Sequence, residues 1–304
     1  MLSSPSDDEV LRWKLLHEAA AYIRPRAVAI YGVELTADAD PGLSDFGENV
    51  GSGTAITVRG TPYLLTAAHV AASKNESQHV GNRRVALALS NADTKEPTLI
   101  RAPYIVTGNP LDLALVRLDA DALAASRVQP VEASCCARSM SEIDRRPLFI
   151  VGYPGEWCRQ VPIAEGGVAE QPIELMTFWR SEMSLWDDSL FAIDVSQSGL
   201  RLQSGQQMDL GKWGGVSGSG VWISCWRKEA EGLQLEEPRL VGVVHRWDKD
   251  AQVLIATRIE AVRSFVLRAV RQESAYYRWL GRGRVIGDPL TDWLAAEQDL
   301  VDLS

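Results

Sequence analysis

The hydrophobic positions along the chain follow a helical period at its two ends and a strand-like period between them. Apolar residues recur at helical spacing in residues 7–23 and again in residues 258–281. The region between them contains short apolar runs separated by polar, glycine- and proline-containing turns, which is typical of β-strands. These runs are residues 27–34, 53–59, 62–66, 84–89, 97–106, 112–118, 173–179, 190–195, 240–247 and 253–257. Such a succession of short strands favours closed antiparallel barrels over a parallel sheet.

A mixed, partly polar stretch in the middle of the chain divides these predicted strands into two groups. We therefore predict five segments: an N-terminal helix (1–24), a first β-barrel (25–130), a connection (131–146), a second β-barrel (147–257) and C-terminal helices (258–304). Pro25 ends the first helix, because proline cannot continue the helical hydrogen bonding. The charge-rich stretch from Arg227 to Arg239 is expected to form a solvated hairpin loop.

The composition is that of a soluble globular protein, with 46% hydrophobic and 23% charged residues. The net charge of −9 argues against a nucleic-acid or anionic-membrane binder, because such proteins present a basic surface. The N-terminus lacks the basic residues and apolar core of a secretory signal, and no run of about 18 apolar residues predicts a membrane-spanning helix. We therefore expect a cytoplasmic protein with no membrane or nucleic-acid partner.

The four cysteines predict neither a disulfide framework nor a metal site. Cys135 and Cys136 are adjacent, and the remaining two, Cys158 and Cys225, add no pair with metal-ligand spacing. We interpret all four as reduced thiols in a reducing compartment. No metal or organic cofactor is expected.

One glycine- and serine-rich stretch, Gly214-Gly215-Val216-Ser217-Gly218-Ser219-Gly220, has the character of a nucleophile loop. A serine hydroxyl becomes a nucleophile only beside a base, and it needs donors to stabilise the oxyanion that it creates. Glycines on both sides of Ser217 allow a tight turn that presents backbone N–H groups to a substrate carbonyl. Taken alone, such a run is also typical of a flexible turn. Ser219 is a rival nucleophile within the same stretch.

Two further stretches supply the partners that a nucleophilic serine requires. Tyr63-Leu64-Leu65-Thr66-Ala67-Ala68-His69 is an apolar strand that ends in a histidine, which is a candidate general base because its pKa lies near neutrality. Asp112 precedes the apolar strand 112–118, where a carboxylate is costly unless it is hydrogen-bonded, for example to an imidazole N–H. Each residue also has a simpler interpretation: a partly buried structural histidine, and a turn aspartate before a strand.

Together, in the order His69, Asp112, Ser217, these stretches resemble the chymotrypsin- and trypsin-like serine proteases. The phrases Thr-Ala-Ala-His, Asp-Leu-Ala-Leu and Gly-Val-Ser-Gly-Ser-Gly each match the family's motifs. Gly51-Ser52-Gly53-Thr54 and the stretch from Phe149 to Gly155 are similar to the bacterial branches, the glutamyl endopeptidases and the HtrA-like proteases without a PDZ domain. The resemblance covers about residues 25 to 265. It implies an all-β fold of two antiparallel six-stranded Greek-key barrels, here with helices added at both ends.

The resemblance also implies roles for individual residues. Ser217 would attack a peptide carbonyl, His69 would act as its base, Asp112 would orient His69, and the N–H groups of Gly215 and Ser217 would form the oxyanion hole. The pocket wall for the substrate would include Val244, His245, Arg246 and Lys212. Val216 departs from the zymogen pattern, in which an aspartate before the nucleophile captures a new N-terminus. We therefore expect activation not to use that salt bridge.

The leading hypothesis is a cytoplasmic serine endopeptidase that acts on a specific protein target. The alternatives are a catalytically silent module that binds a peptide or protein partner, and a non-peptide acyl hydrolase that uses the same three residues. A regulatory protein partner could dock on the terminal helices. An exposed apolar stripe on residues 10–23 would favour docking, whereas a stripe packed on the barrels would give the helix a structural role.

Overall fold

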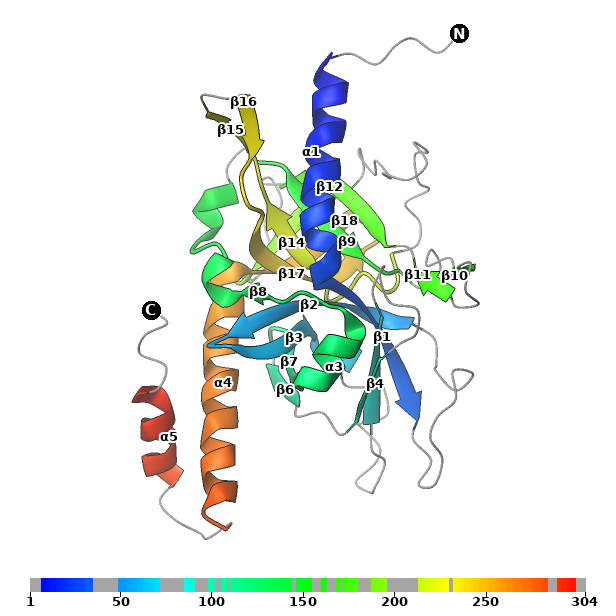
Figure 1. Ribbon diagram of the computed structural model, residues 1–304. Coiled ribbons are helices and arrows are strands. Elements are labelled where there is room, and N and C mark those ends of the chain that lie inside the picture. Colours follow the sequence, from blue (N-terminus) through cyan, green and yellow to red (C-terminus); the bar gives the residue numbers. More distant parts are fainter. Residues whose placement is uncertain are drawn as a thin grey trace.

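The computed structural model shows two β units side by side, with long helices at the two ends of the chain (Figure 1). The structure describes residues 7–34, 49–71, 85–90, 98–101, 105–108, 110–143, 146–154, 160–162, 168–170, 172–179, 187–195, 213–229, 232–283 and 289–298. None of the helices in these ranges is long and apolar enough to cross a membrane.

The first β unit is a sheet of eight strands. Its order is β5-β4-β1-β2-β3-β7-β6, all neighbours running antiparallel, and β8 adds to β2 as a parallel strand. The strands are β1 (Ala27–Glu34), β2 (Asn49–Val58), β3 (Thr61–Ala67), β4 (Val85–Ser90), β5 (Thr98–Arg101), β6 (Ile105–Gly108), β7 (Leu113–Arg117) and β8 (Val131–Glu132). Among the described strands the sheet does not close, so it differs from the closed six-stranded barrel expected here. The expected strand 97–106 is divided into β5 and β6, and the sequence has Pro103, which lacks a backbone N–H, between them.

The second β unit confirms the predicted barrel. Six antiparallel strands close in the order β12-β13-β18-β17-β14-β9. They are β9 (Leu148–Gly152), β12 (Ile173–Trp179), β13 (Leu190–Asp194), β14 (Gly220–Ile223), β17 (Arg239–Asp248) and β18 (Val253–Arg258). Two small hairpins accompany the barrel: β10 (Gln160–Pro162) with β11 (Val168–Glu170), and β15 (Trp226–Glu229) with β16 (Gly232–Leu235). The second hairpin lies in the charged stretch that was expected to be a hairpin loop.

The N-terminal helix α1 (Asp7–Ile23) packs on the second barrel through its C-terminal half. Leu16 and Ile23 are buried, and they join the same apolar core as strands of both β units. Arg24, directly after the helix, pairs with the buried carboxylate of Glu174 on β12. The exposed large apolar side chains described in this helix lie at its start, where Val10 and Leu11 are 52% and 40% exposed. Most of the apolar stripe is thus structural.

The segment between the two β units contains more regular structure than its mixed sequence predicts. Helix α3 (Ala120–Ser126) follows β7, and Asp119 caps it by accepting a hydrogen bond from the N–H of Ala122 at 2.6 Å. Two short 3₁₀ turns, η3 (Ala133–Cys135) and η4 (Met140–Ile143), come next.

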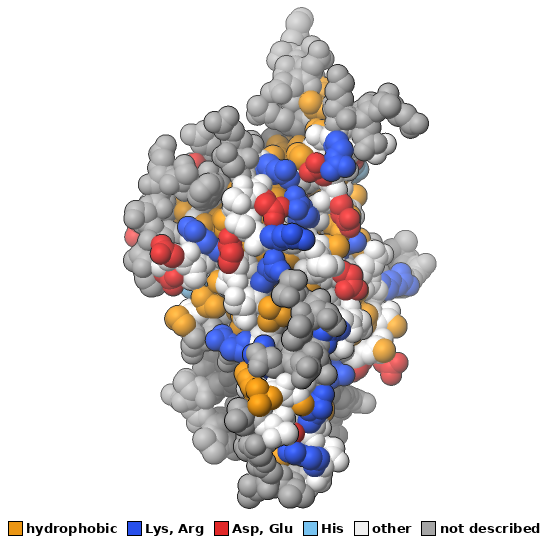
Figure 2. Space-filling view, turned by 90° about the vertical axis from the view of Figure 1, so that its left-hand side faces the viewer, with side chains coloured by type: hydrophobic (Ala, Val, Ile, Leu, Met, Phe, Trp, Pro, Cys, Tyr) orange, Lys and Arg blue, Asp and Glu red, His pale blue; other side chains and the backbone are white. Residues whose placement is uncertain are grey.

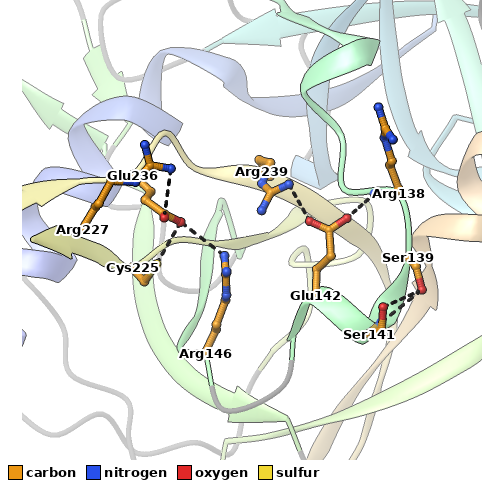
Figure 3. Close-up of polar contacts among 9 residues, drawn as sticks. All are labelled: Arg138, Ser139, Ser141, Glu142, Arg146, Cys225, Arg227, Glu236 and Arg239. Carbon is orange, nitrogen blue, oxygen red and sulfur yellow. Dashed lines mark hydrogen bonds and ion pairs between the residues drawn. The ribbon is translucent and has the colours of Figure 1, made fainter.

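Carboxylates fasten this connecting segment to the second barrel (Figure 3). Glu142 on η4 pairs with Arg239 of β17 at 2.5 Å and accepts the N–H of Arg138 at 2.6 Å. Glu236 receives Arg146 at 3.4 Å and the Cys225 thiol at 2.9 Å. On the face at the left of Figure 1, basic and acidic side chains are intermixed over the upper part of the described surface (Figure 2).

The C-terminal helix α4 (Ile259–Gly281) contacts β6 and β7 of the first sheet and β17 and β18 of the second barrel. Its buried stripe includes Phe265, and its one buried carboxylate in the described part, Glu273, accepts hydrogen bonds from Tyr63 and Arg117 of the first sheet. The short helix α5 (Pro289–Gln298) lies alongside α4 (Figure 1). A helix of 23 residues therefore bridges both β units.

Candidate active site

Asp112 and His69, which both belong to the first β unit, form a close polar pair. Oδ2 of Asp112 lies 2.6 Å from Nδ1 of His69, and its Oδ1 accepts the backbone N–H of His69 at 3.0 Å. The Asp112 carbonyl also accepts the N–H of Ala68 at 2.9 Å. Three contacts thus fix the start of the short helix α2 (Ala68–Ala71) against the start of β7, and they fix the orientation of the imidazole.

The local backbone of Asp112 explains how its side chain reaches His69. Asp112 has a φ of 49°, a left-handed conformation that aspartate tolerates better than most residues. It lies in the turn before β7, and the carbonyl of the preceding Leu111 accepts a hydrogen bond from Thr257 of β18 at 3.2 Å. Burial raises the pKa of Asp112, but the hydrogen bonds and charge of His69 outweigh it, so the pKa lies below its usual value.

The loop that carries Ser217 is attached to the first sheet. The Ser217 carbonyl accepts the N–H of Ser52 on β2 at 2.9 Å, and the Ser52 hydroxyl donates to the Gly215 carbonyl at 2.7 Å. Gly218 has a φ of 89°, and a Cβ on it would lie 2.0 Å from the Ser52 carbonyl oxygen and 3.1 Å from the Ala67 nitrogen. Glycine is therefore required for the loop to approach the end of β3, directly before His69.

The two predicted oxyanion donors remain available for a ligand. Gly215 is in a left-handed conformation with a φ of 96°. Within the described part of the chain, the N–H groups of Gly215 and Ser217 donate to no protein acceptor, although their neighbours do. Over the same residues, no hydrogen bond joins the Ser217 hydroxyl to the His69 ring. Catalytic hydrogen bonds of this kind are often long in a structure without substrate.

The neighbours of Ser217 differ from it in exposure. Ser219 is fully buried, with its hydroxyl against β9 and without a hydrogen-bond partner, whereas Ser217 is half-buried. A substrate could therefore reach Ser217 but not Ser219. Val216 is buried in the apolar core. The aspartate that stands before the nucleophile in the zymogen pattern would need a charged partner at this position.

His245 lies near the same carboxylate oxygen as His69. Its Nε2 is 3.2 Å from Oδ2 of Asp112, and its side chain is 15% exposed, compared with 50% for His69. The sequence predicted a pocket-wall residue at this position, and His245 faces the aspartate. The other ring nitrogen, Nδ1, is buried and has no hydrogen-bond partner.

The remaining predicted substrate residues occupy different environments. Val244 is buried, and its N–H and carbonyl pair with Ser219 and Gly218 of the nucleophile loop, each at 2.8 Å. Arg246 is half-buried on β17, and Lys212 lies outside the described residues. A role of these residues and of His245 in substrate binding stays a prediction.

Two features of the site were not assigned from the sequence. Ser52 connects β2 to the nucleophile loop, and its hydroxyl also accepts the N–H of Tyr153 at 2.8 Å. The stretch Gly-Ser-Gly-Thr around it was noted in the sequence, but no role was assigned to Ser52. Trp213 and Trp247 stack with ring centroids 5.9 Å apart beside the loop, and both indole N–H groups are buried without a partner.

The other chemically notable groups lie apart from the three candidate catalytic residues. A cavity of about 400 Å³ is lined by residues of β2, β3, η3 and α4 and of the segment between η3 and η4, including Arg138 and Arg263, and by none of His69, Asp112 and Ser217. Cys135, Cys136 and Cys225 are free thiols, and burial raises the pKa of Cys136 to about 12. The described residues contain no group of three or more His, Cys, Asp or Glu arranged to hold a metal ion.

Comparison with known proteins gives matches to two family models. The model of the trypsin-like peptidase domain matches residues 51–227. A second model, of a protein of unknown function (DUF2934), matches residues 272–301, which include the end of α4 and helix α5. A search of curated proteins found no match.

Two solved structures resemble the chain at low sequence identity. The MamO protease domain from Magnetospirillum magneticum, in its apo form, is 13% identical and aligns over 80% of this chain and 96% of its own, with a TM-score of 0.42. The second structure comes from work on aromatic interactions that drive the coupled folding and binding of the intrinsically disordered Sesbania mosaic virus VPg protein. It is 15% identical and aligns over 81% of this chain and 91% of its own, with a TM-score of 0.41.

The family model spans the histidine, aspartate and serine stretches, and it covers more than half of the 304 residues. The arrangement of a mainly antiparallel β fold with a closed six-stranded barrel agrees with it. The chain therefore belongs to the family of chymotrypsin- and trypsin-like serine proteases.

Proposed function

We propose that the protein is a serine endopeptidase in which His69, Asp112 and Ser217 form the catalytic triad. Ser217 Oγ attacks the substrate carbonyl, and His69 takes the hydroxyl proton and later donates it to the leaving amine. Asp112 orients the imidazole and stabilises its charged form, and water then hydrolyses the acyl-enzyme. The N–H groups of Gly215 and Ser217 stabilise the oxyanion. The triad is the family's known mechanism; its assignment to these residues is the proposal.

The observation that carries this proposal is the set of contacts between Asp112 and His69. A carboxylate 2.6 Å from Nδ1 leaves Nε2 as the basic nitrogen, which is the tautomer that a general base for serine requires. The unoccupied N–H groups at Gly215 and Ser217 add support, because amides that point at no protein acceptor can receive a developing oxyanion.

We further propose that the enzyme acts inside the cell on a dedicated protein target. The free thiols of Cys135, Cys136 and Cys225 support a reducing compartment. A regulatory partner on the terminal helices stays a prediction; the exposed Val10 and Leu11 are the part of α1 that such a partner could contact.

One observation favours a second candidate, a silent module that binds a peptide or protein. In the described part of the chain, no hydrogen bond connects Ser217 with His69, so the base and the nucleophile are not yet coupled. A module that only binds would keep this arrangement when its partner is present, whereas an enzyme would close the contact in its substrate complex.

Labelling with a fluorophosphonate separates the two candidates. The unmodified chain and a Ser219→Ala control should both label, because the Ser219 side chain is buried and its hydroxyl forms no hydrogen bond. Ser217→Ala should lose the label, and its peptide turnover should fall by roughly 10⁴-fold or more. Labelling that persists in Ser217→Ala contradicts the assignment of the nucleophile, and a folded, unlabelled parent chain supports the silent module.

A further inference from the structure

The carboxylate of Asp112 has two imidazole partners. Oδ2 is 2.6 Å from Nδ1 of His69 and 3.2 Å from Nε2 of His245, while Oδ1 accepts the backbone N–H of His69 at 3.0 Å. A triad needs only the first of these contacts. The described residues therefore place a second imidazole at the same oxygen of Asp112, and the triad does not account for it.

A β-bulge brings His245 to this position. Along β17 and β18, Val244 pairs with Ala256 and Arg246 pairs with Ile255, so His245 is the extra residue between two consecutive pairs. A bulge of this kind redirects a side chain out of the regular alternation of the strand. Without it, the residue after Val244 would keep its ladder partner on β18. The backbone is thus shaped to direct this ring at Asp112.

The chemistry of the ring indicates which form faces the carboxylate. Nε2 lies 3.2 Å from Oδ2, so a neutral ring that carries its proton on Nε2 is within donor distance of Asp112. Nδ1 is buried without a partner, and a second proton there would have no acceptor. Burial holds the pKa of His245 below its usual value against the opposing charge of Asp112; Arg246 and His69 add to the lowering, and Asp187 opposes it. The neutral donor is therefore the favoured form.

We propose that His245 is a positioning residue of the triad: it donates from Nε2 to Asp112, fixes the carboxylate toward His69 and takes a share of its negative charge. The effect of this positioning on catalysis rests on the proposed endopeptidase function. An aspartate that accepts hydrogen bonds from two imidazoles attracts a proton on His69 less strongly than one bonded to His69 alone. Loss of this second partner is therefore expected to move the acid limb of activity to higher pH.

Two substitutions of similar volume test this role. His245→Gln keeps an N–H at about the distance of Nε2 from the backbone and does not titrate, whereas His245→Leu removes the donor. If His245→Leu does not fold, His245→Asn replaces it, because its amide is too short to reach Asp112. Each is made in the parent chain and in the Ser217→Ala background, and folding is compared by thermal unfolding.

The first readout is NMR titration of the histidine rings in the Ser217→Ala background. The chain has four histidines, so the His69 signals can be assigned by substitution. The titration midpoint of His69 should move up by about half to one pH unit in His245→Leu and should stay near the parent value in His245→Gln. An unchanged midpoint in His245→Leu, or an equal shift in both variants, overturns the proposal.

The second readout is the pH dependence of fluorophosphonate labelling in chains that retain Ser217. The acid limb should move to higher pH in His245→Leu and be restored in His245→Gln. A changed KM and an altered preference for the substrate side chain, with no shift of the limb, would instead indicate the substrate-binding role predicted from the sequence, and would overturn the positioning role.

The two readouts also separate this inference from the proposed function. A parent chain that does not label, but whose His69 midpoint moves in His245→Leu, supports the shared carboxylate and contradicts the enzyme. A parent chain that labels normally, with a midpoint and an acid limb that His245→Leu leaves unchanged, supports the enzyme and contradicts the inference.

Discussion

The backbone N–H of Ser52 donates to the carbonyl of Ser217 across 2.9 Å, and this bond connects β2 of the first sheet to the loop of the second barrel. The candidate nucleophile is therefore positioned by the β unit that also carries His69 and Asp112. A chain in which the two units separate would lose this alignment even if each unit remained folded.

The close approach of Gly218 to the Ser52 carbonyl predicts that alanine substitutions at two glycines of the same loop differ sharply in their effects on stability and labelling. Gly218→Ala should abolish labelling and lower the free energy of unfolding by about 3 kcal/mol, because the new Cβ meets backbone at 2.0 Å and φ is 89°. Gly214→Ala should be tolerated, since Gly214 is exposed and a Cβ there meets nothing within 4 Å. Urea unfolding and probe labelling of both variants check this. Equal behaviour of the two would contradict the described loop.

The lowered pKa of Asp112 predicts a pH-dependent contribution to stability. Its pKa in the folded chain lies below the unfolded value of about 3.9, so the ionised group stabilises the fold above pH 4, and this contribution is lost as the pH falls through the folded pKa. The free energies of unfolding of the parent and Asp112→Asn should therefore differ most above about pH 5 and converge on acidification. Urea titrations from pH 7 to pH 3 measure this, with the exposed Asp188→Asn as control. A gap that does not change with pH would refute it.

The buried carboxylate of Glu273 predicts that α4 is fastened to the first sheet by polar contacts. Its oxygens receive the Tyr63 hydroxyl at 2.5 Å and Arg117 at 3.2 Å, and Glu273 is only 3% exposed. Glu273→Ala leaves both donors without an acceptor and should cost about 3 kcal/mol of unfolding free energy. Glu273→Gln, which can still accept from Tyr63, should cost less. Chemical denaturation ranks the two, and an equal loss would mean that packing rather than the carboxylate matters.

The packing of α1 predicts that trimming the N-terminus acts on stability in two steps. Removal of residues 1–11 deletes the exposed Val10 and Leu11 and should leave the melting temperature within about 2 °C. Removal of residues 1–24 also deletes the buried Leu16 and Ile23 and the Arg24 partner of Glu174, so it should lower the melting temperature strongly. Gating of the site by this helix would instead appear as a stable 25–304 chain that labels faster than the parent.

Much of the architecture could be predicted because it depends on short-range patterns. Strand periodicity indicated the closed second barrel, helical periodicity indicated α1 and α4, and three motifs indicated the residues that lie at the junction of the β units. Helix α3 was missed, although Asp119 before an alanine-rich stretch was a capping signal. The expected closure of the first sheet is not seen among the described strands, and closure depends on which distant strands pair.

The sequence by itself determined the order His69, Asp112, Ser217, the glycines of the nucleophile loop and the family, since these are properties of neighbouring residues. The tertiary structure decided how those residues are connected. The bulge that directs His245 at Asp112 adds one residue to β17, and the pairing with β18 rather than local composition determines where that residue lies. The role of Ser52 likewise appears only when two strands far apart in the chain meet. Strand register and long-range contacts are set by the free energy of the whole fold, so no single stretch of sequence encodes them.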